Sequence, residues 1–279
     1  IPEPFYANYN GFAQASDVKV IPVTSKIEDN FALPSIELFE KKINNRTKAI
    51  LICNPCNPTG YVYSKEEIIN IANLAKKNDL FIIVDEVYRE FIYSDLKHFS
   101  ILEDETFFDN AILIDSTSKR YSLCGARIGF IVSKNSKFIE TCMKFALARL
   151  SPPTVALIAA NNALKSDNKY IDNVIKEYSM RRKVLIGELS KINNIEFSDP
   201  MGAFYSIIKL PVKNAEEFAK FLLTDFSINN ESVMLAPAAG FYSSNDNGKD
   251  EVRIAFVLNS EKIKRAINII NIGLKEYIG

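Results

Sequence analysis

The chain has 279 residues, 47% of them hydrophobic, which is enough apolar sequence for a folded core and leaves room for two domains. Its 34 basic and 34 acidic side chains cancel, so no excess of positive charge favours nucleic acid as a partner. The longest apolar runs, such as Leu80 to Val84, are far shorter than the roughly 20 residues that cross a bilayer, and no membrane span is expected.

Four cysteines and a single histidine limit the metal and redox chemistry that the sequence can support. Cys53 and Cys56 form one C-x-x-C, but no second pair exists, so neither a zinc site nor any other metal site is expected. His98 is interpreted as a surface residue of a loop. So few cysteines predict a reduced, cytoplasmic protein. The chain begins at Ile1 with no methionine and no leader, and we expect further sequence before it.

Predicted strands and helices alternate from the start of the chain. An aromatic cluster around Tyr6 precedes a strand over Val18–Val23, a helix over Ser35–Asn44 and a strand over Lys48–Cys53. The segment Asn54–Gly60 reads N-P-C-N-P-T-G. It must be a turn, because proline cannot continue a helix or a strand ladder.

A second strand and helix pair follows this turn. Ser64 and Glu67 form a capping box for a helix that runs to about Lys77, and its apolar face comprises Ile68, Ile71, Ala72 and Ala75. The wholly apolar strand Leu80–Val84 comes next, and Asp85-Glu86-Val87-Tyr88 follows it. A carboxylate at the carboxyl end of a buried strand is either a helix cap or a residue of a ligand site.

The most informative stretch lies after the strand Ala111–Ile114. It reads Ser116-Thr117-Ser118-Lys119, with Arg127 eight residues beyond the lysine. A lysine in a closed pocket loses hydration, and its free amine can then attack a carbonyl to form a Schiff base. Two hydroxyls and a guanidinium are the donors that a phosphate monoester needs. The alternative is a surface loop that carries a solvated Lys–Arg pair.

The second half of the chain predicts a further strand over Ile128–Ser133, and then mainly helices before a change of pattern. Arg253 lies within an apolar strand, where arginine rarely occurs without an anionic partner. The predicted helices are Lys137–Leu150, Thr154–Lys165, Asn168–Ile192, Glu216–Leu223 and Glu261–Tyr277, and the short strands are Ile195–Phe197, Ala203–Ile208, Val233–Leu235 and Val252–Phe256. The pattern indicates an α/β fold with a large domain over residues 1–180 and a smaller α+β domain over 181–279.

In order, these motifs resemble the fold-type I, class I/II aminotransferases that depend on pyridoxal 5′-phosphate (PLP), of which aspartate aminotransferase is an example. The resemblance implies a three-layer, mainly parallel sheet. It also implies that Lys119 holds PLP as a Schiff base while Ser116, Ser118 and Arg127 bind its phosphate. We further expect cis peptide bonds at Glu3-Pro4 and Asn57-Pro58, where the chain must turn sharply.

The resemblance assigns the remaining site residues as well. Asp85 pairs with the ring nitrogen of PLP, and Tyr6 stacks on the ring. Tyr88 and Asn57 reach its phenolic oxygen, and Asn57 also contacts the substrate. Arg253 then binds the α-carboxylate of the substrate through both edges of its guanidinium.

The implied activity is transfer of an amino group between an L-amino acid and a 2-oxo acid, with aspartate as one candidate, by a homodimer. The same motifs also suit a PLP-dependent C–S lyase or an enzyme like aminocyclopropane-carboxylate synthase. A further alternative is a non-catalytic module, either truncated or regulatory. The family's N-terminal phosphate loop is not found in this sequence, so we expect the isolated chain to be largely free of PLP and nearly inactive.

Overall fold

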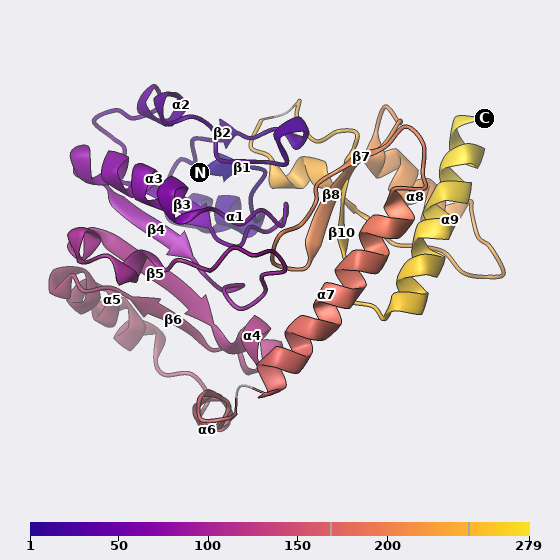
Figure 1. Ribbon diagram of the computed structural model, residues 1–279. Coiled ribbons are helices and arrows are strands. Elements are labelled where there is room, and N and C mark those ends of the chain that lie inside the picture. Colours follow the sequence, from indigo (N-terminus) through magenta and orange to yellow (C-terminus); the bar gives the residue numbers. More distant parts are fainter. Residues whose placement is uncertain (168, 245) are drawn as a thin grey trace. The chain divides into compact units, whose positions relative to one another are not determined.

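The computed structural model describes residues 1–279 with the exception of residues 168 and 245 (Figure 1). The chain divides into two compact units, and neither is a continuous segment. Unit 1 comprises residues 1–32, 56–61 and 176–279, and unit 2 comprises residues 33–55 and 62–175. The domain boundary near residue 180 remains a prediction. Each unit is described below by itself.

Unit 2 is built on a four-stranded sheet with the order β3-β4-β5-β6, drawn in purple to magenta in Figure 1. Strands β3 (Ala49–Cys53), β4 (Phe81–Asp85) and β5 (Ala111–Ser116) are parallel, and β6 (Gly129–Val132) runs antiparallel to β5. Buried side chains line β4 and β5, as expected for parallel strands covered on both faces. The expected mainly parallel α/β architecture is confirmed, with an antiparallel strand at one edge.

The helix α3 (Lys65–Lys77) follows its sequence pattern closely. Glu67 N–H donates to Ser64 Oγ at 3.2 Å, and Ser64 N–H donates to Glu67 Oε2 at 2.7 Å, so the predicted capping box is present. The four residues of the predicted apolar face are all buried. The other helices of unit 2 are α2 (Ile36–Glu40), α4 (Thr117–Arg120), α5 (Ser136–Arg149) and α6 (Thr154–Leu164), with 3-10 turns η2 (Ile101–Glu103), η3 (Glu105–Phe107) and η4 (Cys124–Ala126).

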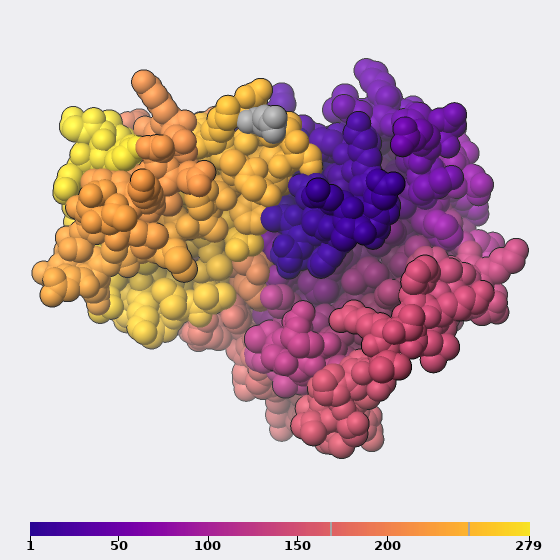
Figure 2. All heavy atoms as spheres, turned by 180° about the vertical axis from the view of Figure 1, so that it is seen from behind, coloured from indigo at the N-terminus to yellow at the C-terminus, as the bar shows by residue number. Residues whose placement is uncertain are grey.

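Helices α5 and α6 carry an unusual amount of exposed apolar surface. Figure 2 shows this pink segment on the outside of the molecule. Its most exposed large apolar side chains are Phe145, Leu147, Leu150 and Val155, which are 75%, 68%, 78% and 80% exposed. Several large apolar side chains exposed on one segment suggest a surface that other protein covers.

Unit 1 contains a second four-stranded sheet with the order β7-β8-β10-β9, in which β10 (Glu251–Ala255) pairs antiparallel with both neighbours. The other strands are β7 (Glu196–Phe197), β8 (Tyr205–Lys209) and β9 (Ala236–Pro237), and β1 (Pro2–Glu3) pairs with β2 (Val23–Thr24) separately. Its helical elements are α1 (Asn8–Ala15), η1 (Ile27–Asp29), α8 (Ala215–Thr224), η5 (Ala238–Phe241) and α9 (Ser260–Ile278). Helix α7 (Lys169–Leu189) begins in unit 2 and continues into unit 1.

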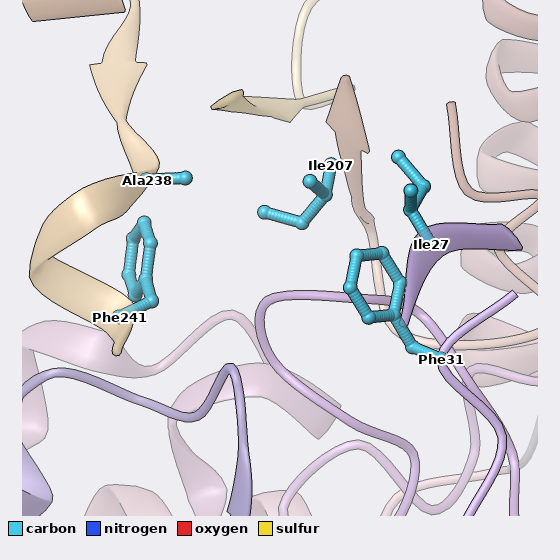
Figure 3. Close-up of a cluster of buried hydrophobic side chains, with 5 residues drawn as sticks. All are labelled: Ile27, Phe31, Ile207, Ala238 and Phe241. Carbon is cyan, nitrogen blue, oxygen red and sulfur yellow. The ribbon is translucent and has the colours of Figure 1, made fainter. Parts of the chain in front are cut away.

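A small hydrophobic cluster joins the distant parts of unit 1 (Figure 3). It brings together side chains from η1 and the residues just after it, from β8 and from η5, namely Ile27, Phe31, Ile207, Ala238 and Phe241. Their burial explains why residues 1–32 belong with the C-terminal part of the chain.

Several predicted elements differ from those observed. The strand over Val18–Val23 is reduced to the two residues of β2, because its pairing partner β1 is itself only two residues long. Val233–Leu235 is not a strand, and the pairing with β10 falls instead on Ala236 and Pro237. The helix over Ser35–Asn44 ends early, at Glu40. Asn168, the first residue of the predicted long helix, lies outside the described residues.

Candidate active site

Lys119 lies in α4, a single helical turn that follows β5 directly. Strand β5 ends at Ser116, whose hydroxyl accepts the Ser118 N–H at 3.0 Å and so caps the turn. This capping places Lys119 just beyond the carboxyl end of a parallel strand, where α/β proteins bind ligands. The Lys119 ammonium lies 5.7 Å from the ring centroid of Tyr88, which is buried.

Asp85 and Tyr88 come from the neighbouring strand end. Asp85 is the last residue of β4, paired in register with Ile114 of β5, and its Oδ1 accepts the Val87 N–H at 3.2 Å. Tyr88 follows in the turn after β4. The sheet of unit 2 therefore brings the predicted residues Asp85, Tyr88 and Lys119 to one edge.

The three predicted phosphate ligands lie at the end of β5, in α4 and just before β6. Ser116 Oγ lies 2.8 Å from Ser118 Oγ and 2.9 Å from the Ile128 carbonyl, and its single hydrogen can be donated to only one of them. Arg127 has a left-handed backbone (φ 57°), and its exposed guanidinium donates to the Cys124 carbonyl at 3.0 Å. Strand β6 then returns beside β5 with Gly129 opposite Ser116.

The donor chemistry of unit 2 fits PLP. An amine is available for the cofactor carbonyl, a half-buried carboxylate for the ring nitrogen, and hydroxyls with a guanidinium for the phosphate. Lys119, Asp85, Ser118 and Arg127 would hold the group.

Glu86, the second residue of the D-E-x-Y motif, is completely buried. It accepts hydrogen bonds from Ser100 Oγ at 2.9 Å and Ile101 N–H at 3.2 Å, and its Oε2 lies 2.8 Å from His98 Nε2. The His98 side chain is only 10% exposed, so its interpretation as a surface residue is wrong. A buried carboxylate needs hydrogen-bond donors, and His98 is drawn inward to supply one.

Arg253 is the central functional candidate of unit 1. It lies in the middle of β10, opposite Ile207 of β8. Its guanidinium carbon lies 4.5 Å from the ring centroid of Tyr205 and 4.8 Å from that of Phe241, so two rings clamp it. Its Nη1 donates to Asn57 Oδ1 at 3.0 Å.

One donor of this arginine is not used. Arg253 Nε is buried and has no hydrogen-bond partner among the residues that the structure describes. A buried, unsatisfied donor costs roughly 1–3 kcal/mol, more when it is charged, so such a group indicates a missing acceptor. A carboxylate fits this place because it accepts two parallel bonds from a guanidinium.

Asn57 belongs to unit 1 because the N-P-x-N-P-T-G turn is fastened there. The turn closes through Gly60 N–H, which donates to the Cys56 carbonyl at 2.9 Å, and Ser198 Oγ donates to the Thr59 carbonyl at 2.9 Å. Gly60 has φ +74°, and a Cβ there would lie 2.3 Å from Pro200 Cβ, so no other residue fits without rearrangement.

The peptide bonds Glu3-Pro4 and Asn57-Pro58 are cis, as predicted, and Asn54-Pro55 is cis as well. Tyr6, the predicted ring-stacking residue, also belongs to unit 1. It is half-buried, its hydroxyl accepts from Asn8 Nδ2 at 2.8 Å, and its ring meets Tyr9 edge-on at 5.5 Å. The predicted site residues thus fall into two groups: Tyr6, Asn57 and Arg253 in unit 1, and the other six in unit 2.

Sequence reasoning missed several residues that hold these groups in place. The rings of Tyr205 and Phe241 were not connected with Arg253, although an arginine in an apolar strand calls for neighbours that orient it. Arg120, directly after Lys119, was also missed. The structure pairs it with two carboxylates, Glu90 and Asp115.

The comparisons with known proteins agree with this geometry. The family model for aminotransferase class I and II matches residues 1–270. The aspartate aminotransferase of Pyrococcus abyssi is 32% identical over 99% of this chain and 69% of its own length.

Two crystal structures are similar as well. The aromatic aminotransferase of Pyrococcus horikoshii superposes with a TM-score of 0.89 at 30% identity, covering 99% of this chain and 73% of that one. The aspartate aminotransferase of Thermotoga maritima gives 0.87 at 30% identity, covering 98% and 68%. By sequence and by fold, the chain belongs to the class I and II aminotransferases.

Proposed function

We propose that this aminotransferase carries PLP on Lys119 and binds the α-carboxylate of its substrate on Arg253. The unsatisfied, ring-clamped guanidinium of Arg253 is the observation that carries the proposal. It is a preformed site for a carboxylate, the group that amino acids and 2-oxo acids have in common.

The predicted site residues of unit 2 then have distinct roles. PLP, when bound, supplies an electron sink for the carbon that carries the amino group. The half-buried Asp85 carboxylate would favour a protonated ring nitrogen, since a nearby negative charge favours the charged form of its partner. The Lys119 amine would serve as the base that takes the proton from the substrate Cα. Ser118 and Arg127 bind the phosphate.

The substrate side chain is the finer part of the proposal. The relatives from Pyrococcus abyssi and Thermotoga maritima are named aspartate aminotransferases, and the one from Pyrococcus horikoshii an aromatic aminotransferase. We infer that L-aspartate is the first amino donor to test, with 2-oxoglutarate as the acceptor. Arg253 serves any L-amino acid, so the choice of side chain lies with other residues.

We also infer that the enzyme is a homodimer and works in the cytoplasm. Support for the first inference comes from the apolar side chains that α5 and α6 expose, since a second copy would bury them. In the residues that the structure describes, no helix is long and apolar enough to cross a membrane. Light scattering should give twice the mass of one chain.

The decisive experiment measures 2-oxo acid release from L-aspartate at saturating PLP, with and without an added 2-oxo acid acceptor. An aminotransferase completes its cycle only with the acceptor, so sustained release should depend on it. Sustained release without acceptor would favour the lyase alternative. Failure of PLP to bind in an equilibrium titration would favour the non-catalytic alternative, truncated or regulatory, in agreement with the expectation that this chain alone is largely free of PLP.

A further inference from the structure

Arg120 occupies a bridging position beside the cofactor lysine. Its Nη2 donates to Asp115 Oδ2 at 2.7 Å, and its Nε lies 2.6 Å from Glu90 Oε1. The Arg120 side chain is 14% exposed, and those of Glu90 and Asp115 are 20% and 10% exposed. One guanidinium therefore joins two largely buried carboxylates.

The two carboxylates belong to the two strand ends that carry the predicted cofactor residues. Asp115 lies on β5, and its Oδ1 accepts the N–H of Ser116 at 2.7 Å. Glu90 lies in the turn after β4, two residues beyond Tyr88. Arg120 thus connects the β5 end, which leads into Lys119, with the turn that holds the Tyr88 ring against the Lys119 ammonium.

Further ion pairs connect the residues of the turn 86–90 with one another. Arg89 Nε lies 3.8 Å from Glu90 Oε1, and Arg89 Nη1 lies 3.7 Å from the buried Glu86, which anchors His98. The turn 86–90 is therefore held at both ends, at one by Glu86 and at the other by Glu90.

The helix that carries Lys119 is too short to be stable by itself. Helix α4 has only four residues, and one helical turn fixes several dihedral angles for very few hydrogen bonds. An outside attachment must therefore set the direction of its side chains. The Arg120 pairs are such an attachment, one residue from Lys119.

We propose that Arg120 is a positioning residue for Lys119, acting as a two-armed brace between Asp115 and Glu90. The proposal rests on the assignment of Lys119 as the cofactor lysine. A guanidinium suits the task because it is a rigid, planar cation that can hydrogen-bond one carboxylate and pair with another, whereas a lysine is a point charge on a flexible stem. The brace fixes the distance between the Lys119 amine and the Tyr88 ring.

The buried charges complicate a simple deletion. Burial raises the pKa of the Glu90 carboxyl, and the opposing effect of Arg120 is smaller. Removing Arg120 alone would leave two carboxylates without their partner, which typically costs several kcal/mol of stability. The informative variant therefore combines Arg120→Leu with Glu90→Gln and Asp115→Asn, so that the brace disappears without a stranded charge.

The first measurement needs no cofactor. An amine-specific acylating reagent labels the lysines of the apo protein over a range of pH, and peptide mapping gives the rate at Lys119 and at the exposed Lys77 of the same unit. Charge changes near Lys119 shift the pH midpoint of its labelling, while the limiting rate at high pH reports access to the amine. We expect that limiting rate to rise about tenfold in the triple variant, because the local structure opens more easily, with Lys77 unchanged.

A matched control removes a comparable arginine elsewhere. Arg181 belongs to unit 1, its side chain is 17% exposed, and its Nε lies 2.8 Å from Glu177 Oε1. Arg181→Leu with Glu177→Gln should leave the labelling of Lys119 unchanged. A control that accelerates Lys119 labelling as much as the triple variant would mean that general loosening explains the effect.

The second measurement links the brace to the cofactor. PLP affinity should fall about tenfold in the triple variant, and so should the rate at which borohydride reduction fixes the pyridoxyl group on Lys119. The midpoint of thermal unfolding should stay near that of the wild type. If wild-type protein does not bind PLP, the proposed function fails, but the labelling of the apo protein still decides the role of Arg120. An unchanged limiting rate at Lys119 in a folded triple variant would overturn the proposal.

Discussion

The two units hold their key arginines in opposite ways. Arg253 of unit 1 lies over two aromatic rings, and among the residues that the structure describes its polar partner is the neutral amide oxygen of Asn57. Arg120 of unit 2 has two carboxylate partners, Glu90 and Asp115. Both side chains are oriented by their neighbours, but only the second is neutralised by them.

This difference separates a ligand-binding arginine from a positioning arginine. Rings orient a guanidinium through their faces and leave its in-plane donors and its charge available for an incoming anion. Carboxylates instead neutralise the charge of the guanidinium, so its attraction for an anionic ligand is weaker. Partner chemistry therefore tells more about the role of an arginine than its burial does.

The largest effect on activity should come from removing the Lys119 amine, which the pairs of Arg120 with Glu90 and Asp115 position. Lys119→Ala should lower transamination at least about 10⁴-fold, because the amine both holds the cofactor and moves the proton. Borohydride reduction of the wild type followed by peptide mapping should place the pyridoxyl group on Lys119. Lys134→Ala is the control, since Lys134 also lies over a ring, that of Phe108 at 5.5 Å. Label on another lysine would refute the assignment.

The second largest effect on turnover should come from changing Asp85. Asp85→Asn should keep PLP bound but lower turnover about a thousandfold, because an amide cannot hold the ring nitrogen protonated. Turnover and PLP content are measured on the same preparation. Near-normal turnover would show that Asp85, which already accepts the Val87 N–H, serves only to shape the turn.

The ligand-binding role of Arg253 predicts a loss in substrate affinity. Arg253→Ala should raise KM about a hundredfold for every amino acid tried, because they all carry an α-carboxylate. Steady-state kinetics with aspartate, alanine and an aromatic amino acid check this. An increase confined to aspartate would make Arg253 a reader of the side-chain carboxylate instead.

The rings of Tyr205 and Phe241, which lie over the Arg253 guanidinium, should have a smaller effect on substrate affinity. Phe241→Leu should raise KM about threefold, since a cation–π contact contributes roughly 0.5–1 kcal/mol where it is partly solvated. Phe221→Leu is the matched control, because Phe221 stacks on Phe226 in the same unit and has no recorded contact with Arg253. Equal changes in both variants would contradict an orienting role for the ring.

The smallest effect concerns a buried carboxyl on the strand of Arg253. Burial raises the pKa of Glu251, although Tyr242 Oη donates to it at 2.7 Å. A raised pKa in the folded state means that Glu251 favours folding at low pH and opposes it as pH rises through that pKa. Glu251→Gln should therefore equal the wild type near pH 4 and exceed its stability at pH 7, by up to about 1 kcal/mol. Denaturant titrations at both pH values measure this, and a variant less stable at pH 7 would contradict it.

Local sequence patterns predicted the framework of unit 2 well. The three parallel strands and the capping box of Ser64 and Glu67 depend on neighbours in sequence, so periodicity was sufficient to find them. The cis bonds at Glu3-Pro4 and Asn57-Pro58 were predicted from the family resemblance and are present. The grouping of Asp85, Tyr88 and Lys119 at one edge followed from the rule that parallel strands share their carboxyl ends.

Contacts between distant segments were beyond such patterns. Nothing near His98 in the sequence indicates that it pairs with a buried Glu86. The two rings around Arg253 come from β8 and η5, so only the folded sheet and turn bring them together. Arg120 looked like one more surface charge beside Lys119, because its partners are set by the register of β4 and β5.

The discontinuous make-up of unit 1 bears on how a ribosome-bound chain acquires its structure. The Phe5 N–H donates to the Phe241 carbonyl at 2.9 Å, and the Ser243 N–H donates to the fully buried Glu3 at 2.8 Å. Within this sequence, residues 1–32 are made long before their partners Phe241 and Ser243, whereas all of unit 2 has been made by residue 175. Unit 2 can therefore fold before residues 1–32 have their partners. Until then, residues 1–32 remain unfolded and accessible to chaperones and proteases.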